Sequence, residues 1–239
     1  MSSPSWVLCD TSVIPGSSAS LNLLRQGDAY SIQVGTAELM TNLDRGSEKA
    51  LATITCERLA GHAAPRILIG GLGMGFTLRA ALGALGPDAK VVVAELIPAV
   101  VTWARGPLAH LFGDSLDDPR VEIVEADVNR LIQLGPERFD AILLDVDNGP
   151  SGMTRRENDR LYDAWGLRRA HYALRSGGIL AVWSGKPDRR FKARLRVHGF
   201  VVDEYRIHAN GGADGPQHVL WMATRPAAPL RFASLGSRT

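Results

Sequence analysis

One segment constrains the fold of this chain more than any other: Arg66-Ile-Leu-Ile-Gly-Gly-Leu-Gly-Met-Gly-Phe-Thr-Leu-Arg79. Its apolar first part predicts a buried strand, which leads directly into a Gly-x-Gly-x-Gly turn formed by Gly71, Gly73 and Gly75. Glycines let the backbone turn sharply and approach a ligand without side-chain obstruction. The helix that follows points its first N–H groups at the same place. The segment therefore predicts a strand, a turn and a helix that together hold a nucleotide.

A second apolar run, residues 90–95, indicates which nucleotide. It ends in Glu95, twenty residues after Gly75, where a carboxylate can accept hydrogen bonds from both hydroxyls of a ribose. A dinucleotide-binding turn needs glycine at its first, third and sixth positions. Counted from Gly71 or Gly73, the sixth position is a large apolar residue. The spacing favours S-adenosylmethionine or a relative of it over a dinucleotide, and a purely structural glycine-rich turn is the remaining alternative.

Three aspartates come at the ends of other predicted strands. Asp145 and Asp147 lie two residues apart before an Asn-Gly-Pro turn, so an extended chain directs both side chains to one side. Two such carboxylates can orient a cationic amine and take its proton, although capping of the turn is the structural alternative. Asp127 follows another strand and precedes a helix. It can cap that helix, accept a hydrogen bond from the adenine amino group, or do both.

Residues 66–225 alternate between predicted strands and helices. The strands are expected at 66–70, 90–95, 121–126, 139–145, 178–184, 200–206 and 218–225, and the helices near 75–85, 97–111, 127–134, 157–174 and 188–198. This alternation predicts an α/β, doubly wound parallel sheet with helices on both faces and a ligand beyond the carboxyl ends of the strands.

The N-terminal part reads differently. Residues 6–43 carry short segments broken by glycine-containing turns, which predict two or three strands in hairpin style. Ser47 can cap a helix that runs to about Gly61. We therefore expect a β-hairpin segment at 1–45, a nucleotide-binding catalytic domain at 46–226 and a flexible tail at 227–239.

Composition excludes several classes of protein. A chain of 239 residues with 45% hydrophobic content can bury one full core, and its net charge of +2 does not favour nucleic acid as a partner. Cys9 and Cys56 have no Cys or His cluster around them, so neither a disulfide framework nor a metal site is expected. We expect a cytoplasmic protein with no membrane association, because no signal sequence or long apolar run is present. A homodimer is compatible with the sequence, which does not set the oligomeric state.

Two further features are open to more than one interpretation. Trp183 ends a predicted strand and can wall a substrate pocket or belong to the core. The loop at 209–216 can act as a lid, which would make His218 a pocket residue. The basic helix at 188–198 is interpreted as a solvated face rather than an RNA contact.

These motifs together resemble the spermidine synthase family, the polyamine aminopropyltransferases, over roughly residues 45–205. The resemblance rests on the order of Gly71-Leu-Gly-Met-Gly75, Glu95, Asp127, Asp145, Leu161-Tyr162 and Leu174-Arg-Ser-Gly-Gly. It implies a Rossmann-like sheet of the class I methyltransferase type, in which Glu95 holds the ribose, Asp127 the adenine and Asp145 the attacking amine. It also implies transfer of an aminopropyl group from decarboxylated S-adenosylmethionine to putrescine or a related small amine, with release of methylthioadenosine.

The chain departs from that family at three places. Met74 stands where the family has an aspartate, Gly46-Ser47-Glu48 replaces Tyr-His-Glu, and Asp145-Val-Asp147-Asn-Gly-Pro150 replaces an Asp-x-x-Asp-Pro signature. Without the aspartate, selection against the carboxylate of intact S-adenosylmethionine is relaxed. The sequence therefore predicts an alkyl transferase that uses either sulfonium. An S-adenosylmethionine-dependent methyltransferase of unknown acceptor and a non-catalytic nucleotide-binding protein are the alternatives.

Overall fold

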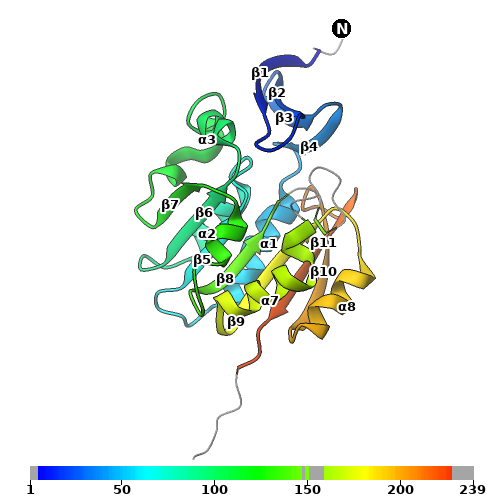
Figure 1. The fold of residues 1–239 in the computed structure, drawn as a ribbon. Helices are drawn as coiled ribbons and strands as arrows, with labels where there is room; N and C mark the ends of the chain where they lie inside the picture. Colours follow the sequence, from blue (N-terminus) through cyan, green and yellow to red (C-terminus); the bar gives the residue numbers. More distant parts are fainter. Residues whose placement is uncertain (1–4, 147–148, 151–158, 228–239) are drawn as a thin grey trace, which may run out of the picture.

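The computed structural model describes residues 5–146, 149–150 and 159–227. Two sheets organise these residues: a small antiparallel sheet built from the N-terminal segment and a larger sheet built from the rest of the chain (Figure 1). The small sheet lies beyond one end of the larger one (Figure 1).

The small sheet has four strands in sequence order, each antiparallel to the next. They are β1 (Val7–Val13), β2 (Ser20–Gln26), β3 (Ala29–Val34) and β4 (Ala37–Thr41). The expectation of two or three strands was therefore too low. Gly35 has a φ of 59° and lets the chain reverse between β3 and β4 within two residues, which makes the two strands easy to read as one in the sequence.

The larger sheet has the order β10-β11-β9-β8-β5-β6-β7. Its strands are β5 (Arg66–Gly70), β6 (Lys90–Glu95), β7 (Val121–Glu125), β8 (Phe139–Leu144), β9 (Leu174–Ser184), β10 (Val201–His208) and β11 (Gln217–Thr224). All seven predicted strands are present, and the α/β doubly wound class is confirmed. The prediction of a wholly parallel sheet was wrong: β11 runs antiparallel to both of its neighbours, because the loop at 209–216 joins β10 and β11 as a hairpin.

Helices cover both faces of this sheet, and the strand residues alternate between the two faces. They are α1 (Gly46–Arg58), α2 (Phe76–Ala84), α3 (Pro98–Arg105), α4 (Ala109–Phe112), α5 (Val128–Ile132), α6 (Asp159–Tyr162), α7 (Ala164–Ala173) and α8 (Arg189–Val197), with a short 3-10 helix at Gly113–Leu116. Ile67 and Ile69 belong to one core cluster with residues of α1, α2 and α3, while Leu68 belongs to a second cluster with residues of α5, α7 and α8. This period of two is what a sheet buried on both faces requires.

Three helix predictions need correction. The helix expected at 97–111 is interrupted after Arg105, where Gly106 and Pro107 separate α3 from α4. The helix expected at 157–174 is divided at Asp163, whose side chain accepts hydrogen bonds from the first N–H groups of α7; its residues 157 and 158 lie outside the described residues. Ser47 does not cap α1, because the helix begins after Arg45 and the Ser47 hydroxyl has other partners.

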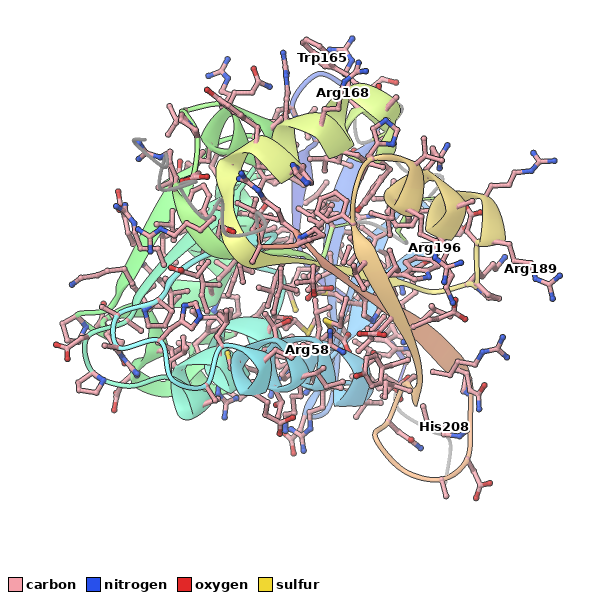
Figure 2. The ribbon with its side chains drawn as sticks, turned by 90° about the horizontal axis from the view of Figure 1, so that it is seen from below. Arg58, Trp165, Arg168, Arg189, Arg196 and His208 are labelled. Carbon is pink, nitrogen blue, oxygen red and sulfur yellow. The ribbon has the colours of Figure 1, made fainter. Side chains whose placement is uncertain are left out.

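The exposed face of α8 is basic. On α8, Phe191 and Leu195 are buried, whereas Arg189 and Arg196 point away from the body of the protein (Figure 2). This arrangement fits the interpretation of 188–198 as a solvated amphipathic helix. Among the described helices, none combines the length and the apolar character that crossing a bilayer would require.

Candidate active site

The glycine turn between β5 and α2 adopts a backbone conformation that only glycine takes without strain. Gly71, Gly73 and Gly75 have φ values of 91°, 50° and 77°. A Cβ on Gly71 would lie 2.5 Å from the carbonyl oxygen of Asp145, and one on Gly75 would overlap the ring of Phe112. The turn is therefore fixed against the end of β8 on one side and against α4 on the other.

A cavity opens beside this turn at the carboxyl ends of β5, β6 and β8, where the strand order reverses direction. In doubly wound sheets this is the usual place for a ligand. One wall is apolar and comes from the small sheet and its turns: Ile14, Leu21, Ile32, Val34, Leu39 and Met40. The lining also includes Gly71, Gly73 and four acidic side chains: Glu48, Glu95, Asp127 and Asp145.

The structure thus brings most of the predicted site residues together in one cavity. Gly75 is not part of the lining. It is the residue that precedes the first turn of α2. Asp147 lies outside the described residues. Among the described residues, no group of His, Cys, Asp or Glu side chains is arranged to hold a metal ion.

Glu95 is the last residue of β6 and is 6% exposed. Its Oε2 accepts a hydrogen bond from the backbone N–H of Leu72 at 2.9 Å, and its Oε1 accepts one from the N–H of Ile97 at 2.8 Å. Burial raises the pKa of this carboxyl, and the backbone N–H groups oppose that shift. The carboxylate also lines the cavity, where it can accept a hydrogen bond from a ligand hydroxyl. Glu95 therefore joins the glycine turn to the cavity and can hold both at once.

Asp127 has the capping role that the sequence suggested. Its side chain accepts a hydrogen bond from the N–H of Asn129 at 2.8 Å, at the start of α5. The same residue lines the cavity. The cap fixes the orientation of the carboxylate and leaves its second oxygen without a described hydrogen bond, so capping and ligand binding are compatible.

Asp145 follows β8 and is held by a residue that the sequence analysis missed. Thr77, in the first turn of α2, donates a hydrogen bond from Oγ1 to Asp145 Oδ2 at 2.6 Å. Burial raises the pKa of Asp145 to about 6, although the bond from Thr77 lowers it. The only signal for Thr77 in the sequence is a hydroxyl residue between the apolar residues Phe76 and Leu78.

Glu48 is the fourth acidic residue of the cavity, and the sequence analysis had noted it only as a retained carboxylate. It lies in the first turn of α1 and is 8% exposed. Burial, followed by the negative charge of Asp145, raises the pKa of Glu48 to about 7. Two buried carboxylates that repel each other favour a cationic ligand, because the cation relieves the repulsion.

Comparison with known proteins agrees with this geometry. The chain is 30% identical over 151 residues to a polyamine aminopropyltransferase of Mycobacterium tuberculosis. The aligned region covers 59% of this chain and 28% of the relative. It is 32% identical over 181 residues to polyamine aminopropyltransferase 1 of Streptomyces coelicolor. This aligned region covers 70% of the chain and 32% of the relative. No family model matches the chain.

The chain is thus similar to polyamine aminopropyltransferases over 59% to 70% of its own length. The crystal structure of spermidine synthase from Thermotoga maritima has the same fold, with a TM-score of 0.73, 20% sequence identity and coverage of 93% of this chain and 74% of that one. The chain spans about a third of the length of the two curated relatives.

The departures from this family have a structural basis in the described residues. At Gly46, where the family has a tyrosine, a Cβ would overlap the backbone of Gly211, and the Gly46 N–H donates a hydrogen bond to the carbonyl oxygen of Ala209 at 2.7 Å. The loop at 209–216 thus occupies the space in which a side chain at position 46 would begin. Trp183 lines the cavity, whereas His218 lies behind it and is not part of the lining.

The expectation that Met74 faces the donor is wrong. Its side chain is 1% exposed, packs in the core cluster beneath the glycine turn and does not line the cavity. The turn directs the side chain at this position inward, because Gly73 and Gly75 on either side both have positive φ. Because Met74 does not line the cavity, its side chain can affect the choice between the two sulfonium donors only indirectly.

We expect Met74→Asp to destabilise the protein before it alters the choice of donor. An unpaired carboxylate in an apolar core lowers the free energy of unfolding by about 2–3 kcal/mol, which corresponds to about 4–12 °C in Tm for a chain of this size. Thermal unfolding at constant pH measures this loss. Met74→Leu keeps the volume and serves as the control. An unchanged Tm in Met74→Asp would show that the side chain reaches the cavity.

Proposed function

We propose that this chain transfers an alkyl group, in the first place the aminopropyl group of decarboxylated S-adenosylmethionine, to a small amine. The observation that carries the proposal is one cavity in which a nucleoside half and an amine half adjoin. Gly71, Gly73, Glu95 and Asp127 surround the first half, and the buried pair of Glu48 and Asp145 marks the second.

The nucleoside half is suited to a ribose and an adenine. The carboxylate of Glu95 is fixed by backbone N–H groups that include those of Leu72 and Ile97, and it lines the cavity. Asp127 lines the same cavity, and one of its oxygens has no hydrogen bond within the described part of the chain. Gly71 and Gly73 allow the backbone to approach the ligand closely, and the apolar wall from the small sheet, which includes Met40, covers the opposite side.

The amine half is suited to a cation that must lose a proton. An alkylammonium with a pKa of about 10 carries no lone pair for attack at neutral pH, so a base is needed. Asp145 is buried, held by Thr77, and has a pKa raised to about 6, which lies close to the working pH of a general base. Glu48 adds a second negative charge, which compensates the charges of the ammonium and the sulfonium.

The chemistry needs alignment more than it needs a special nucleophile. The neutral amine attacks a carbon attached to the sulfonium sulfur, the carbon–sulfur bond breaks, and its electron pair stays on sulfur as a thioether. One proton leaves the amine in the course of the reaction. Holding the two reactants in line within one closed cavity supplies much of the rate increase.

The nucleoside product tests this proposal. The protein is incubated with each sulfonium and a panel of small amines, and the products are analysed by mass spectrometry. We expect methylthioadenosine together with an aminopropylated amine. S-Adenosylhomocysteine with a methylated acceptor would replace the proposal by methyl transfer, and tight binding of methylthioadenosine with no product from any amine would replace it by a nucleoside-binding role.

A further inference from the structure

Behind the cavity, the hydroxyl of Ser47 is surrounded by three polar partners. Its Oγ lies 2.7 Å from Glu48 Oε2, 2.9 Å from His218 Nδ1 and 3.0 Å from Trp183 Nε1. Ser47 is completely buried, so no water competes for these bonds. The three partners come from different parts of the chain: α1, β11 and β9.

A count of protons limits how these four groups can bond. A serine hydroxyl offers one proton and two lone pairs, and an indole N–H can only donate. Trp183 therefore occupies one lone pair of Ser47. The hydroxyl proton goes to either Glu48 or His218, and the remaining partner must donate to the second lone pair.

Two arrangements that satisfy this count differ by the place of one proton. In the first, Glu48 is protonated and donates to Ser47, and Ser47 donates to a neutral His218 at Nδ1. In the second, Ser47 donates to an ionised Glu48, and His218 donates from Nδ1 to Ser47. Passing from the first to the second moves one proton from Glu48 to Ser47 and another from Ser47 to His218. Ser47 is unchanged, and the net result is one proton transferred from Glu48 to His218.

The two ends of this chain of bonds lie in different environments. Glu48 lines the cavity next to Asp145, whereas His218 is half-buried at the start of β11 and does not reach the cavity. The edge of one ring packs on the face of the other between Trp183 and His218, with centroids 4.6 Å apart. This contact fixes the imidazole, so that its Nδ1 stays directed at Ser47.

We propose that Ser47 and His218 form a proton relay that carries the proton of the acceptor amine from Glu48 to the protein surface. The proposal rests on the proposed function for the source of the proton. The amine gives its proton to the carboxylate pair, Glu48 passes it through Ser47 to His218 Nδ1, and the imidazolium releases the proton on Nε2 to water. No oxidant, reductant or further reactant is needed.

The electrostatic surroundings of the two ends of the relay differ. Burial and Asp145 raise the pKa of Glu48 to about 7, and burial lowers the pKa of His218. Asp44 raises the pKa of both groups. On β10 the residue opposite His218 is Ile207, which does not titrate. Glu48 therefore holds a proton more tightly than His218, and release of the proton from the imidazolium to water completes the transfer.

Chemical rescue tests the relay in turnover. We expect His218→Ala to lower kcat by about tenfold to a hundredfold, less than the loss of a direct base, with the KM for the nucleoside donor unchanged. Added imidazole should restore kcat in proportion to its concentration, which a structural role would not produce. The matched control is His208→Ala, a half-buried histidine on the neighbouring strand whose side chain bonds to Gly215 and Gln217. Wild-type kcat in His218→Ala, or a loss that imidazole does not restore, would overturn the proposal.

A second measurement does not need turnover and separates the relay from the proposed function. The titration of His218 is followed by NMR in the wild-type protein and in Glu48→Gln, with Glu57→Gln, an exposed glutamate of α1, as control. We expect the midpoint of His218 to move to lower pH only in Glu48→Gln, because the anion that favours the imidazolium is lost. An unchanged midpoint overturns the relay. A shifted midpoint in a protein that turns over neither sulfonium supports the connection and removes the proposed function.

Discussion

Asp145→Asn is expected to lower turnover at least about a hundredfold and to leave the affinity for methylthioadenosine nearly unchanged. The amide keeps the shape of the side chain and can still accept the hydrogen bond from Thr77, but it cannot take a proton from the amine. A positioned base contributes about 10²–10⁴-fold to the rate. Single-turnover kinetics with decarboxylated S-adenosylmethionine and the preferred amine measure the loss, and calorimetry with the nucleoside provides the control. Near-normal turnover would remove Asp145 from the mechanism.

The pH dependence adds a second test of the same residue. Because burial raises the pKa of Asp145 to about 6, the ionised form needed for catalysis is lost as the pH falls through that value. Turnover should therefore rise with pH across this range. Thr77→Val removes a bond that lowers the pKa of Asp145, so the acid limb of the profile should move to higher pH. A limb that stays in place would show that another group controls it.

Glu95→Gln is expected to weaken the binding of methylthioadenosine by roughly tenfold to 150-fold. Losing a charged partner of the ribose hydroxyls costs about 1.5–3 kcal/mol. The amide also presents an N–H group to one of the backbone donors at Leu72 and Ile97, which then lacks an acceptor. The matched control is Glu125→Gln: Glu125 is the residue opposite Glu95 on the neighbouring strand β7, and its side chain is exposed. Equal affinities of the two variants in calorimetry would show that the nucleoside lies elsewhere.

The parts of this site that could be predicted are those that depend on short stretches of chain. Gly71, Gly73 and Gly75 are conspicuous because a turn with three positive φ values excludes other residues. Glu95 and Asp145 follow from a single rule, that residues just past parallel strands meet at one edge of the sheet. Both steps need only the local pattern and the order of the elements.

The parts that could not be predicted depend on contacts between distant segments. Ser47 has the position of a helix cap in the sequence, but its hydroxyl bonds to Trp183 and His218, which lie 136 and 171 residues away. Thr77 meets Asp145 across 68 residues. The apolar wall that the small sheet contributes has no local signature either, because it depends on how the two sheets are placed. Propensities and spacing carry no information about such pairings.

The contact between Gly46 and Gly211 ties two distant parts of this protein to a common evolutionary history. Because a Cβ on Gly46 would overlap the backbone of Gly211, an ancestor with a tyrosine at position 46 would have needed a different path for the loop at 209–216. A tyrosine at position 46 depends on a different path of the loop, whereas a glycine there is compatible with either path. Returning the aromatic side chain by a single substitution would displace the hairpin that carries His218. Engineering a polyamine site into this cavity therefore requires exchange of the residue and the loop as one unit.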